Sequence, residues 1–291
     1  MRIDLEQRRV DAIADFDFDG FISGIKFRAA VNDYEHTELE GEEVGTKFDV
    51  HGFDGRLELQ HAAIGPLVGA VGVQYKLVEF DAVGEEAFVP GSDTKQVSAF
   101  IYEEMRVTDS FVLQGSARIE EQTIQGPTIA ENYDDTAVGA SVGAVWRLSD
   151  SFRISANAAM TERHPTATEL YADGPHVAAQ RYERGSVSLG NGLLSEEEST
   201  NFDVTLHGDG GRLEWEITGY INSIDNYILL RPTGEELDEL PVYDFEQTDA
   251  EFVGLEAQAT VELMDDGNNH WHVKLFTDLS LIHISEPTRH I

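Results

Sequence analysis

Apolar and polar residues alternate with a period of two along most of the chain. In one such stretch Leu213, Trp215 and Ile217 alternate with Glu214 and Glu216. Successive side chains of a β-strand point to opposite faces, so strict alternation over this length indicates strands rather than helices. The same alternation recurs in further segments, among them 111–119, 152–160 and 253–263.

Twelve segments fit this pattern, and the connections between them alternate in length. Six short connections read DFDG, IGP, TD, SD, DG and DDGNN, and are built from residues that make tight turns. The long connections are expected near 34–46, 79–94, 121–136, 163–197 and 225–249. The predicted strands are 3–16, 23–33, 47–62, 67–78, 95–107, 110–120, 137–148, 151–162, 198–208, 211–224, 250–264 and 270–281.

This alternation of short and long connections predicts a sheet with all turns at one end and all loops at the other. An up-and-down meander has this arrangement, and a transmembrane barrel combines short periplasmic turns with long outer loops. The runs are close to the length that a tilted membrane strand needs. A soluble sandwich would have mixed loop lengths and shorter strands. We therefore predict an all-β fold: an antiparallel up-and-down transmembrane β-barrel, present in part with about 12 strands.

The charge and residue composition of the chain exclude several kinds of partner and site. The formal charge is −35, from 55 Asp and Glu against 20 Lys and Arg, so we expect no nucleic-acid partner. Cysteine is absent, which excludes a disulfide framework and a thiolate metal site. The chain shows neither the apolar core of a signal peptide nor an apolar run long enough for a transmembrane helix.

Several longer motifs resemble one known family. The segments TERHPTATELYADGPHVAAQRYERGS, LSEEESTNFDVTL, GYINSIDNYILL and LPVYDFEQTDAEFVGLEAQ resemble the barrel of TonB-dependent outer-membrane receptors. Two earlier segments, NDYEHTELEGEEVGTKF and GEEAFVPGSDTKQVSAFIYEE, look like loops of the zinc-uptake branch. The resemblance runs in order from about residue 1 to 280. It implies a twenty-two-stranded barrel with a plug inside, in the outer membrane, with lipid and the TonB complex as partners.

The chain departs from that family pattern in ways that suggest a fragment. No plug domain or TonB-contacting segment is recognised, and about twelve strands are fewer than the family's barrel has. We expect residues 1–280 to be a partial receptor barrel, with TonB contacted through the missing plug region. The tail LIHISEPTRHI breaks the alternation and resembles translated sequencing adapter, so residues 281–291 are expected to be a non-native tail.

The resemblance also implies a metal or metal-chelate ligand, with zinc as a transported ligand rather than a resident cofactor. Imidazole nitrogen and carboxylate oxygen are suitable zinc ligands. His176, in YADGPHVA, matches the family's loop motif best, and Asp173 lies nearby. His164, before Pro165, is expected to be a structural turn residue. The other candidates are His36, Glu38, Glu42, Glu85 and Glu86, from two earlier loops.

No enzyme signature appears in the sequence. Its glycine pairs lack the strand-then-helix context of a phosphate loop, and neither G-x-S-x-G nor H-E-x-x-H occurs. We therefore expect a non-enzyme without a cofactor. Three functions stay open: a fragment of a receptor and transporter for a scarce ligand, a passive porin-type barrel, or a soluble acidic β-sheet surface protein resembling an adhesin.

Overall fold

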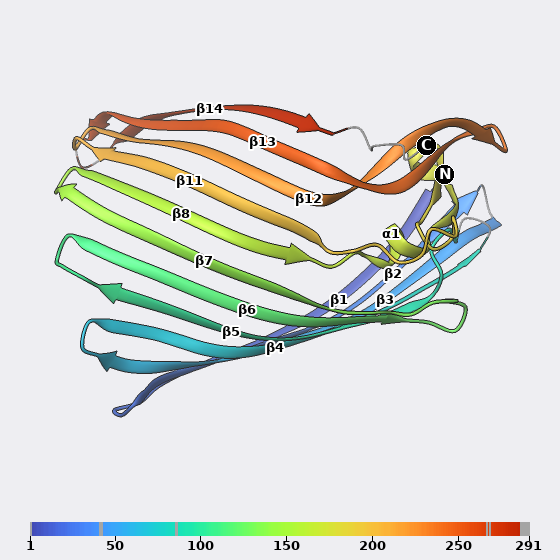
Figure 1. Cartoon of the computed structure of the whole chain (residues 1–291), viewed down its shortest axis with the longest axis horizontal. Coiled ribbons are helices and arrows are strands. Elements are labelled where there is room, and N and C mark those ends of the chain that lie inside the picture. Colours follow the sequence, from blue (N-terminus) through green and yellow to red (C-terminus); the bar gives the residue numbers. More distant parts are fainter. Residues whose placement is uncertain (1, 41–42, 85–86, 266, 268, 286–291) are drawn as a thin grey trace.

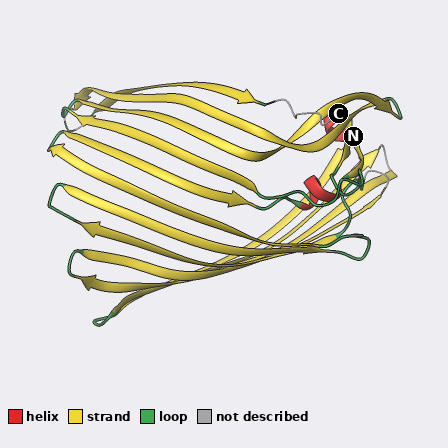
Figure 2. Ribbon diagram, viewed as in Figure 1, coloured by secondary structure: helices red, strands yellow, loops and turns green. Residues whose placement is uncertain are grey.

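In the computed structural model, one curved antiparallel sheet takes up most of the chain (Figures 1 and 2). The structure describes residues 2–40, 43–84, 87–265, 267 and 269–285. Strands that follow one another pair antiparallel from β1 to β8, and β8, β11, β12, β13 and β14 continue the order. Within the described part, β1 pairs only with β2 and β14 only with β13, so the sheet stays open. The predicted all-β up-and-down fold is confirmed.

Twelve of the fourteen strands are long and correspond to the twelve predicted segments. Their bounds are β1 Arg2–Asp17, β2 Ile22–Glu40, β3 Glu43–Ile64, β4 Leu67–Gly84, β5 Ser92–Arg106, β6 Phe111–Gln125, β7 Tyr133–Ser149, β8 Phe152–Arg163, β11 Glu197–Asp209, β12 Leu213–Leu237, β13 Leu240–Asp265 and β14 His270–Ile284.

The remaining elements lie in the long connection between β8 and β11. They are α1 (Ala167–Tyr171), β9 (Asp173–His176), the 3₁₀ turn Val177–Ala179 and β10 (Arg181–Arg184). β9 and β10 form a small hairpin, and β10 pairs in parallel with Val242–Asp244 of β13. Figure 1 shows α1 at the end of the sheet opposite the short turns, where the prediction placed the long connections.

Several predicted loops are strand extensions instead. The connection expected at 34–46 is a hairpin in which β2 and β3 continue to Glu40 and from Glu43. The connection expected at 225–249 is likewise the end of β12, a turn at Asp238 and Glu239, and the start of β13. In these extensions the alternation of apolar and polar residues fades, although the backbone ladder continues.

The turn at Asp238 and Glu239 lacks the usual sequence signal. Both residues have positive φ, 51° and 65°, and the flanking pair is Leu237 with Leu240. This is the geometry of a two-residue type I′ turn, which normally carries Asn-Gly or Asp-Gly. No local signal therefore predicts a hairpin at this position.

The two faces of the sheet differ in polarity. The outward face is apolar and exposed: Val142, Phe202 and Leu255 are 58%, 50% and 50% exposed. On the opposite face Ser116 Oγ lies 2.7 Å from Ser141 Oγ, and polar side chains hydrogen-bond from strand to strand. An apolar exterior over a polar interior is typical of a barrel in lipid. In the described part of the chain, no helix has the length and apolar character needed to cross a membrane.

Large aromatic side chains mark the short-turn end of the outward face. Trp146 and Trp271 are 51% and 62% exposed there, and the Phe152 and Trp215 rings lie 6.1 Å apart. Such a girdle suits the level where lipid headgroups meet hydrocarbon.

Glycine lets large side chains lie across neighbouring strands. Phe100 of β5 extends over Gly72 of β4, and its ring receives the guanidinium of Arg56 from β3 at 4.0 Å. A Cβ on residue 72 would collide with the Phe100 ring and come within 2.6 Å of the Leu57 carbonyl oxygen. The side chain at this position is therefore restricted to hydrogen by close approach.

Candidate ligand-binding region

The loop end of the sheet contains a small apolar core. Ile124, Tyr133, Leu170 and Tyr171 are buried together, with Ile124 and Leu170 fully so. Burial, with the hydrogen bond that Tyr133 donates to Glu196, raises the pKa of Tyr133 well above its usual value. Burial, together with the nearby carboxylate of Glu131, raises the pKa of Tyr171 to about 12. Both phenols stay neutral, and this core packs segment 163–197 onto β6 and β7.

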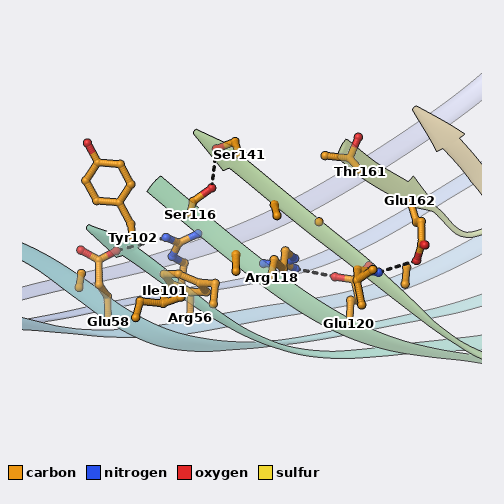
Figure 3. Close-up of a pocket in the computed structure, with 17 residues that line it drawn as sticks. Arg56, Glu58, Ile101, Tyr102, Ser116, Arg118, Glu120, Ser141, Thr161 and Glu162 are labelled. Carbon is orange, nitrogen blue, oxygen red and sulfur yellow. Dashed lines mark hydrogen bonds and ion pairs between the residues drawn. The ribbon is translucent and has the colours of Figure 1, made fainter. Parts of the chain in front are cut away.

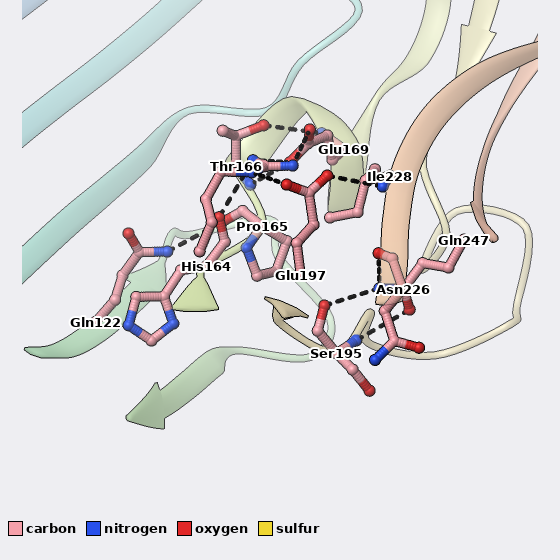
Figure 4. Close-up of polar contacts among 11 residues, drawn as sticks. Gln122, His164, Pro165, Thr166, Glu169, Ser195, Glu197, Asn226, Ile228 and Gln247 are labelled. Carbon is pink, nitrogen blue, oxygen red and sulfur yellow. Dashed lines mark hydrogen bonds and ion pairs between the residues drawn. The ribbon is translucent and has the colours of Figure 1, made fainter. Parts of the chain in front are cut away.

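A charged network joins the two ends of the same segment and ties them to β12 (Figure 4). Arg163 donates to Glu197 Oε2 at 2.7 Å and to both carboxylate oxygens of Glu169 at 3.1 Å. Glu169 also completes the capping box of α1 with Thr166. The other oxygen of Glu197 accepts the backbone N–H of Ile228 at 2.8 Å. Three neighbouring strands, β8, β11 and β12, therefore meet α1 at one ion-paired centre.

Burial alone would raise the pKa of Glu197. The hydrogen bonds from Arg163 and the Ile228 amide outweigh burial and hold that pKa below its usual value. Glu197 therefore stays ionised at neutral pH and remains an anionic partner for the Arg163 guanidinium. The carboxylate acts as a clamp between β8 and the loop-side half of β12.

Neighbouring polar contacts extend this clamp (Figure 4). Gln247 of β13 accepts from the Ser195 N–H at 3.2 Å and donates to the Ser195 carbonyl at 2.9 Å and the Asn226 carbonyl at 3.0 Å. Gln122 of β6 donates to the Pro165 carbonyl at 3.0 Å. His164 is 6% exposed, and its Nδ1 lies 2.8 Å from the Tyr133 hydroxyl. His164 thus lies buried directly after the end of β8, at the junction with the long connection.

The β9–β10 hairpin carries the first-choice metal candidate. His176 Nδ1 lies 2.8 Å from Glu183 Oε1, and the imidazole stacks on Phe88 with ring centroids 4.7 Å apart. Arg181 also donates to Glu183 Oε1, at 2.7 Å. The Glu183 side chain is 3% exposed and that of His176 is 37% exposed. A buried carboxylate therefore fixes the orientation of a half-exposed imidazole.

Asp173 lies on the same strand but on its other face. His176 pairs with Arg181 across the hairpin, and Asp173 pairs with Arg184. Residues three apart on a strand point to opposite sides, and Asp173 accepts a hydrogen bond from Tyr182 at 3.1 Å. The structure therefore does not bring Asp173 and His176 together as a shared ligand pair.

His36 lies on the extension of β2, within the region predicted to be a loop. Its ring stacks on Phe48 with centroids 4.4 Å apart, and its Nε2 is 4.0 Å from Glu38 Oε1. His36 and Glu38 are two apart on one strand, so they share a face. The side chains are 19% and 13% exposed. These two candidates do lie together, in a partly buried aromatic setting.

The other three candidates, Glu42, Glu85 and Glu86, lie outside the described residues. Within the described residues, no group of three His, Asp or Glu side chains is placed to hold a metal ion. The metal set therefore stays a prediction. Its best-defined described members are His176 and the His36–Glu38 pair.

The sequence did not single out the residues that surround His176. Glu183 and Arg181 alternate on β10, which would have suggested a shared face had this strand been predicted. Arg181 lies over the Tyr243 ring at 5.4 Å, and Phe88 comes from the connection between β4 and β5. Contacts between segments this far apart leave no local signal in the chain.

The polar face of the sheet is hollowed into a second region, a cavity of about 570 Å³ that spans β3 to β8 (Figure 3). Each arginine in it has a carboxylate two residues along its own strand. Arg56 lies 3.2 Å from Glu58, and Arg118 lies 2.5 Å from Glu120. Because these charges are already paired, neither arginine offers this cavity a free ionic group.

A curved antiparallel meander with an apolar exterior over a polar interior is typical of the class of membrane β-barrels. The family described as TonB dependent receptor-like, beta-barrel matches residues 4–283. The chain belongs to this family.

Individual proteins give the same picture. The vitamin B12 transporter BtuB of Photobacterium profundum is 26% identical over 132 residues, which are 45% of this chain and 20% of that protein. The copper transporter OprC superposes with a TM-score of 0.74 at 18% identity, covering 97% of this chain and 47% of OprC.

The FrpB iron transporter of Neisseria meningitidis (F3-3 variant) superposes with a TM-score of 0.72 at 12% identity, covering 96% of this chain and 43% of FrpB. At such identities the structural likeness establishes the fold alone. The chain spans less than half the length of these three proteins.

Proposed function

We propose that this chain is the barrel part of an outer-membrane receptor that takes up a scarce ligand with energy supplied through TonB. Family membership supports this function over a passive porin or a soluble surface protein. The proteins it resembles are named as transporters and receptors, in line with the expected absence of an enzymatic activity and of a cofactor. The exposed apolar belt supports a location in outer-membrane lipid.

Within this function we propose that the ligand is a metal species, with Zn²⁺ first. The single observation that carries this choice is the contact between His176 Nδ1 and the buried Glu183. A metal-bound imidazole usually holds a carboxylate through its other ring nitrogen, which fixes ring orientation and raises ligand basicity. Glu183 is in place to do this while His176 Nε2 serves as the ligand.

The finer choice of ligand is open to direct comparison. BtuB is named for vitamin B12, OprC for copper and FrpB for iron. Titrating the purified protein in detergent with Zn²⁺, Cu²⁺ and vitamin B12 by calorimetry ranks these options. We expect Zn²⁺ to bind. We expect His176→Ala to weaken that binding at least tenfold, because the variant removes one of the ligands.

A matched control is His51→Ala. His51 Nδ1 also lies 2.8 Å from a carboxylate, that of Asp33, but on β3 and without a buried partner. We expect this variant to bind Zn²⁺ as the parent does. If the parent and His176→Ala bind Zn²⁺ with equal affinity, His176 is not a zinc ligand. If vitamin B12 binds tightly in the same experiment, the proposed receptor function stands with a different ligand.

A further inference from the structure

Two arginines face each other at the short-turn end of the sheet. Arg147 of β7 is the direct register partner of Arg153 of β8, and Arg153 is in turn the partner of His207 of β11. Cross-strand partners share a face and lie close together, so like charges placed opposite each other destabilise a sheet. The chain has only 20 Lys and Arg against 55 Asp and Glu. An adjacent arginine pair in so acidic a chain calls for a compensating partner.

Neither arginine has that partner within the described part of the chain. On the same polar face Arg56 and Arg118 pair with Glu58 and Glu120, two residues further along their own strands. The corresponding positions for Arg147 and Arg153 are serines, at 149 and 155. Within the described residues no carboxylate lies within ion-pair distance of either guanidinium, whereas His207 Nδ1 is 3.8 Å from Glu216. The pairing that neutralises Arg56 and Arg118 is therefore missing at this row.

A cavity of about 670 Å³ lies at this row, between the short turns of β5–β6 and β7–β8 and the end of β11. Besides the two arginines it is lined by hydroxyl-bearing residues and by turn carboxylates. Asp209 is engaged in its own turn, where it accepts the Gly211 N–H at 2.9 Å. The lining includes Arg147, Arg153, Ser110, Ser149, Ser151 and Asp209.

We propose that this row is a binding site for a phosphoryl oxyanion. Two guanidinium forks on adjacent strands can each make paired hydrogen bonds to one tetrahedral anion, and the serine hydroxyls can donate to its remaining oxygens. Bound phosphate neutralises the two like charges, which explains why the sheet keeps them opposite each other. The site is independent of the ligand that the loop end captures.

The phosphoryl group has two sources, a soluble phosphate or a phospholipid headgroup. Trp146 and Phe152 are the chain neighbours of Arg147 and Arg153, and they lie at the same level on the outward face, whereas the two arginines lie on the polar face. A headgroup therefore reaches the guanidinium pair only around the rim formed by the short turns. Aromatic residues at that level of a barrel lie beside lipid headgroups. Both sources present the same oxyanion to the guanidinium pair, so experiment has to separate them.

The test uses the whole chain in a zwitterionic detergent at low ionic strength. Inorganic pyrophosphate is titrated by calorimetry, and phosphatidylglycerol is added in native mass spectrometry. We expect at least one probe to bind, and the double variant R147Q/R153Q to bind it at least tenfold more weakly. The variant removes a repulsion, so its resistance to urea should equal or exceed that of the parent.

The matched control is R106Q/R212Q, which removes the same charge from two positions that do not line this cavity. This control should keep affinity within twofold. D109N/D150N, which removes two rim carboxylates, should tighten binding of the anion. Pyrophosphate binding alone assigns a soluble phosphate, and phosphatidylglycerol binding alone assigns the headgroup. The proposal is overturned if neither probe binds, if the control loses as much affinity as R147Q/R153Q, or if D109N/D150N weakens binding.

Discussion

Between β7 and β8 the chain reverses through Asp150 and Ser151, whereas between β8 and β11 it runs from 164 to 196 through a helix and a hairpin. The short reversal depends on local backbone geometry. The long one depends on a buried core, on the ion pair between Arg163 and Glu197, and on hydrogen bonds that reach β6, β12 and β13. The turn end of the sheet is thus held by neighbours in sequence, and the loop end by tertiary contacts. Only the second kind of end can be lost while the sheet persists.

The largest expected effect comes from Leu170→Ala, which empties a fully buried position in the loop-end core. Such a truncation costs about 2–5 kcal/mol. We expect segment 163–197 to become open to protease while the β-sheet circular dichroism stays unchanged. Leu193→Ala is the control, because Leu193 is already 37% exposed, and it should leave proteolysis unaltered. Loss of the whole sheet in Leu170→Ala would show that the two ends are not separable.

Glu197→Gln should loosen the same end by about 1–3 kcal/mol, because the amide leaves Arg163 without its closest anionic partner. Its pH dependence sharpens the prediction. The folded pKa of Glu197 lies below the usual 4.5, so its stabilising effect is complete above that pH and is lost as the pH falls through the folded pKa. Protease resistance of the parent should drop in acid. In Glu197→Gln this part of the drop should be absent.

Gly72→Ala probes the middle of the sheet, between the two ends. The added Cβ meets the Phe100 ring and approaches a backbone oxygen. We expect a loss of about 1–3 kcal/mol in urea unfolding, as for other overpacked sites. Gly219→Ala is the matched control, since nothing lies within 4 Å of its added Cβ. Equal stability of the two variants would mean that Phe100 moves aside without cost.

The smallest effect should come from the hairpin tip of β12 and β13. Replacing Asp238→Asn together with Glu239→Gly supplies residues that adopt positive φ easily. We expect a gain of about 0.4–1 kcal/mol, seen as slower proteolysis of the hairpin. The neighbouring substitution Glu236→Gln leaves the turn untouched and should change nothing. A less stable hairpin in the double variant would contradict the type I′ assignment.

The same contrast between local and tertiary contacts explains how much of the structure could be predicted from the sequence. The twelve long strands and their short turns were predictable because alternation and turn residues are local signals. The extensions were missed because alternation of apolar and polar residues fades in them: Tyr34 to Glu38 carry polar or aromatic side chains on both faces of the strand. At the candidate site the motif singled out His176 as a candidate ligand, but its contacts Glu183 and Phe88 were not predicted, because no local pattern links positions this far apart. Asp173 shows the opposite kind of error. It is close to His176 in sequence, but the two residues are three apart on one strand and therefore point to opposite faces.

The parallel ladder between β10 and β13 carries a consequence for assembly. It joins Arg184 to Asp244, and the Arg184 guanidinium closes the contact through hydrogen bonds of 2.6 and 3.0 Å to that carboxylate. Sixty residues separate the two partners. One edge of β10 pairs locally with β9, but its other edge has no partner until β13 has formed. The hairpins from β1 to β8 can form in sequence order, because each strand pairs with the one before it. The β9–β10 hairpin that carries His176 is therefore among the last parts to dock. Once it is docked, the strand it pairs with, β13, is already in register.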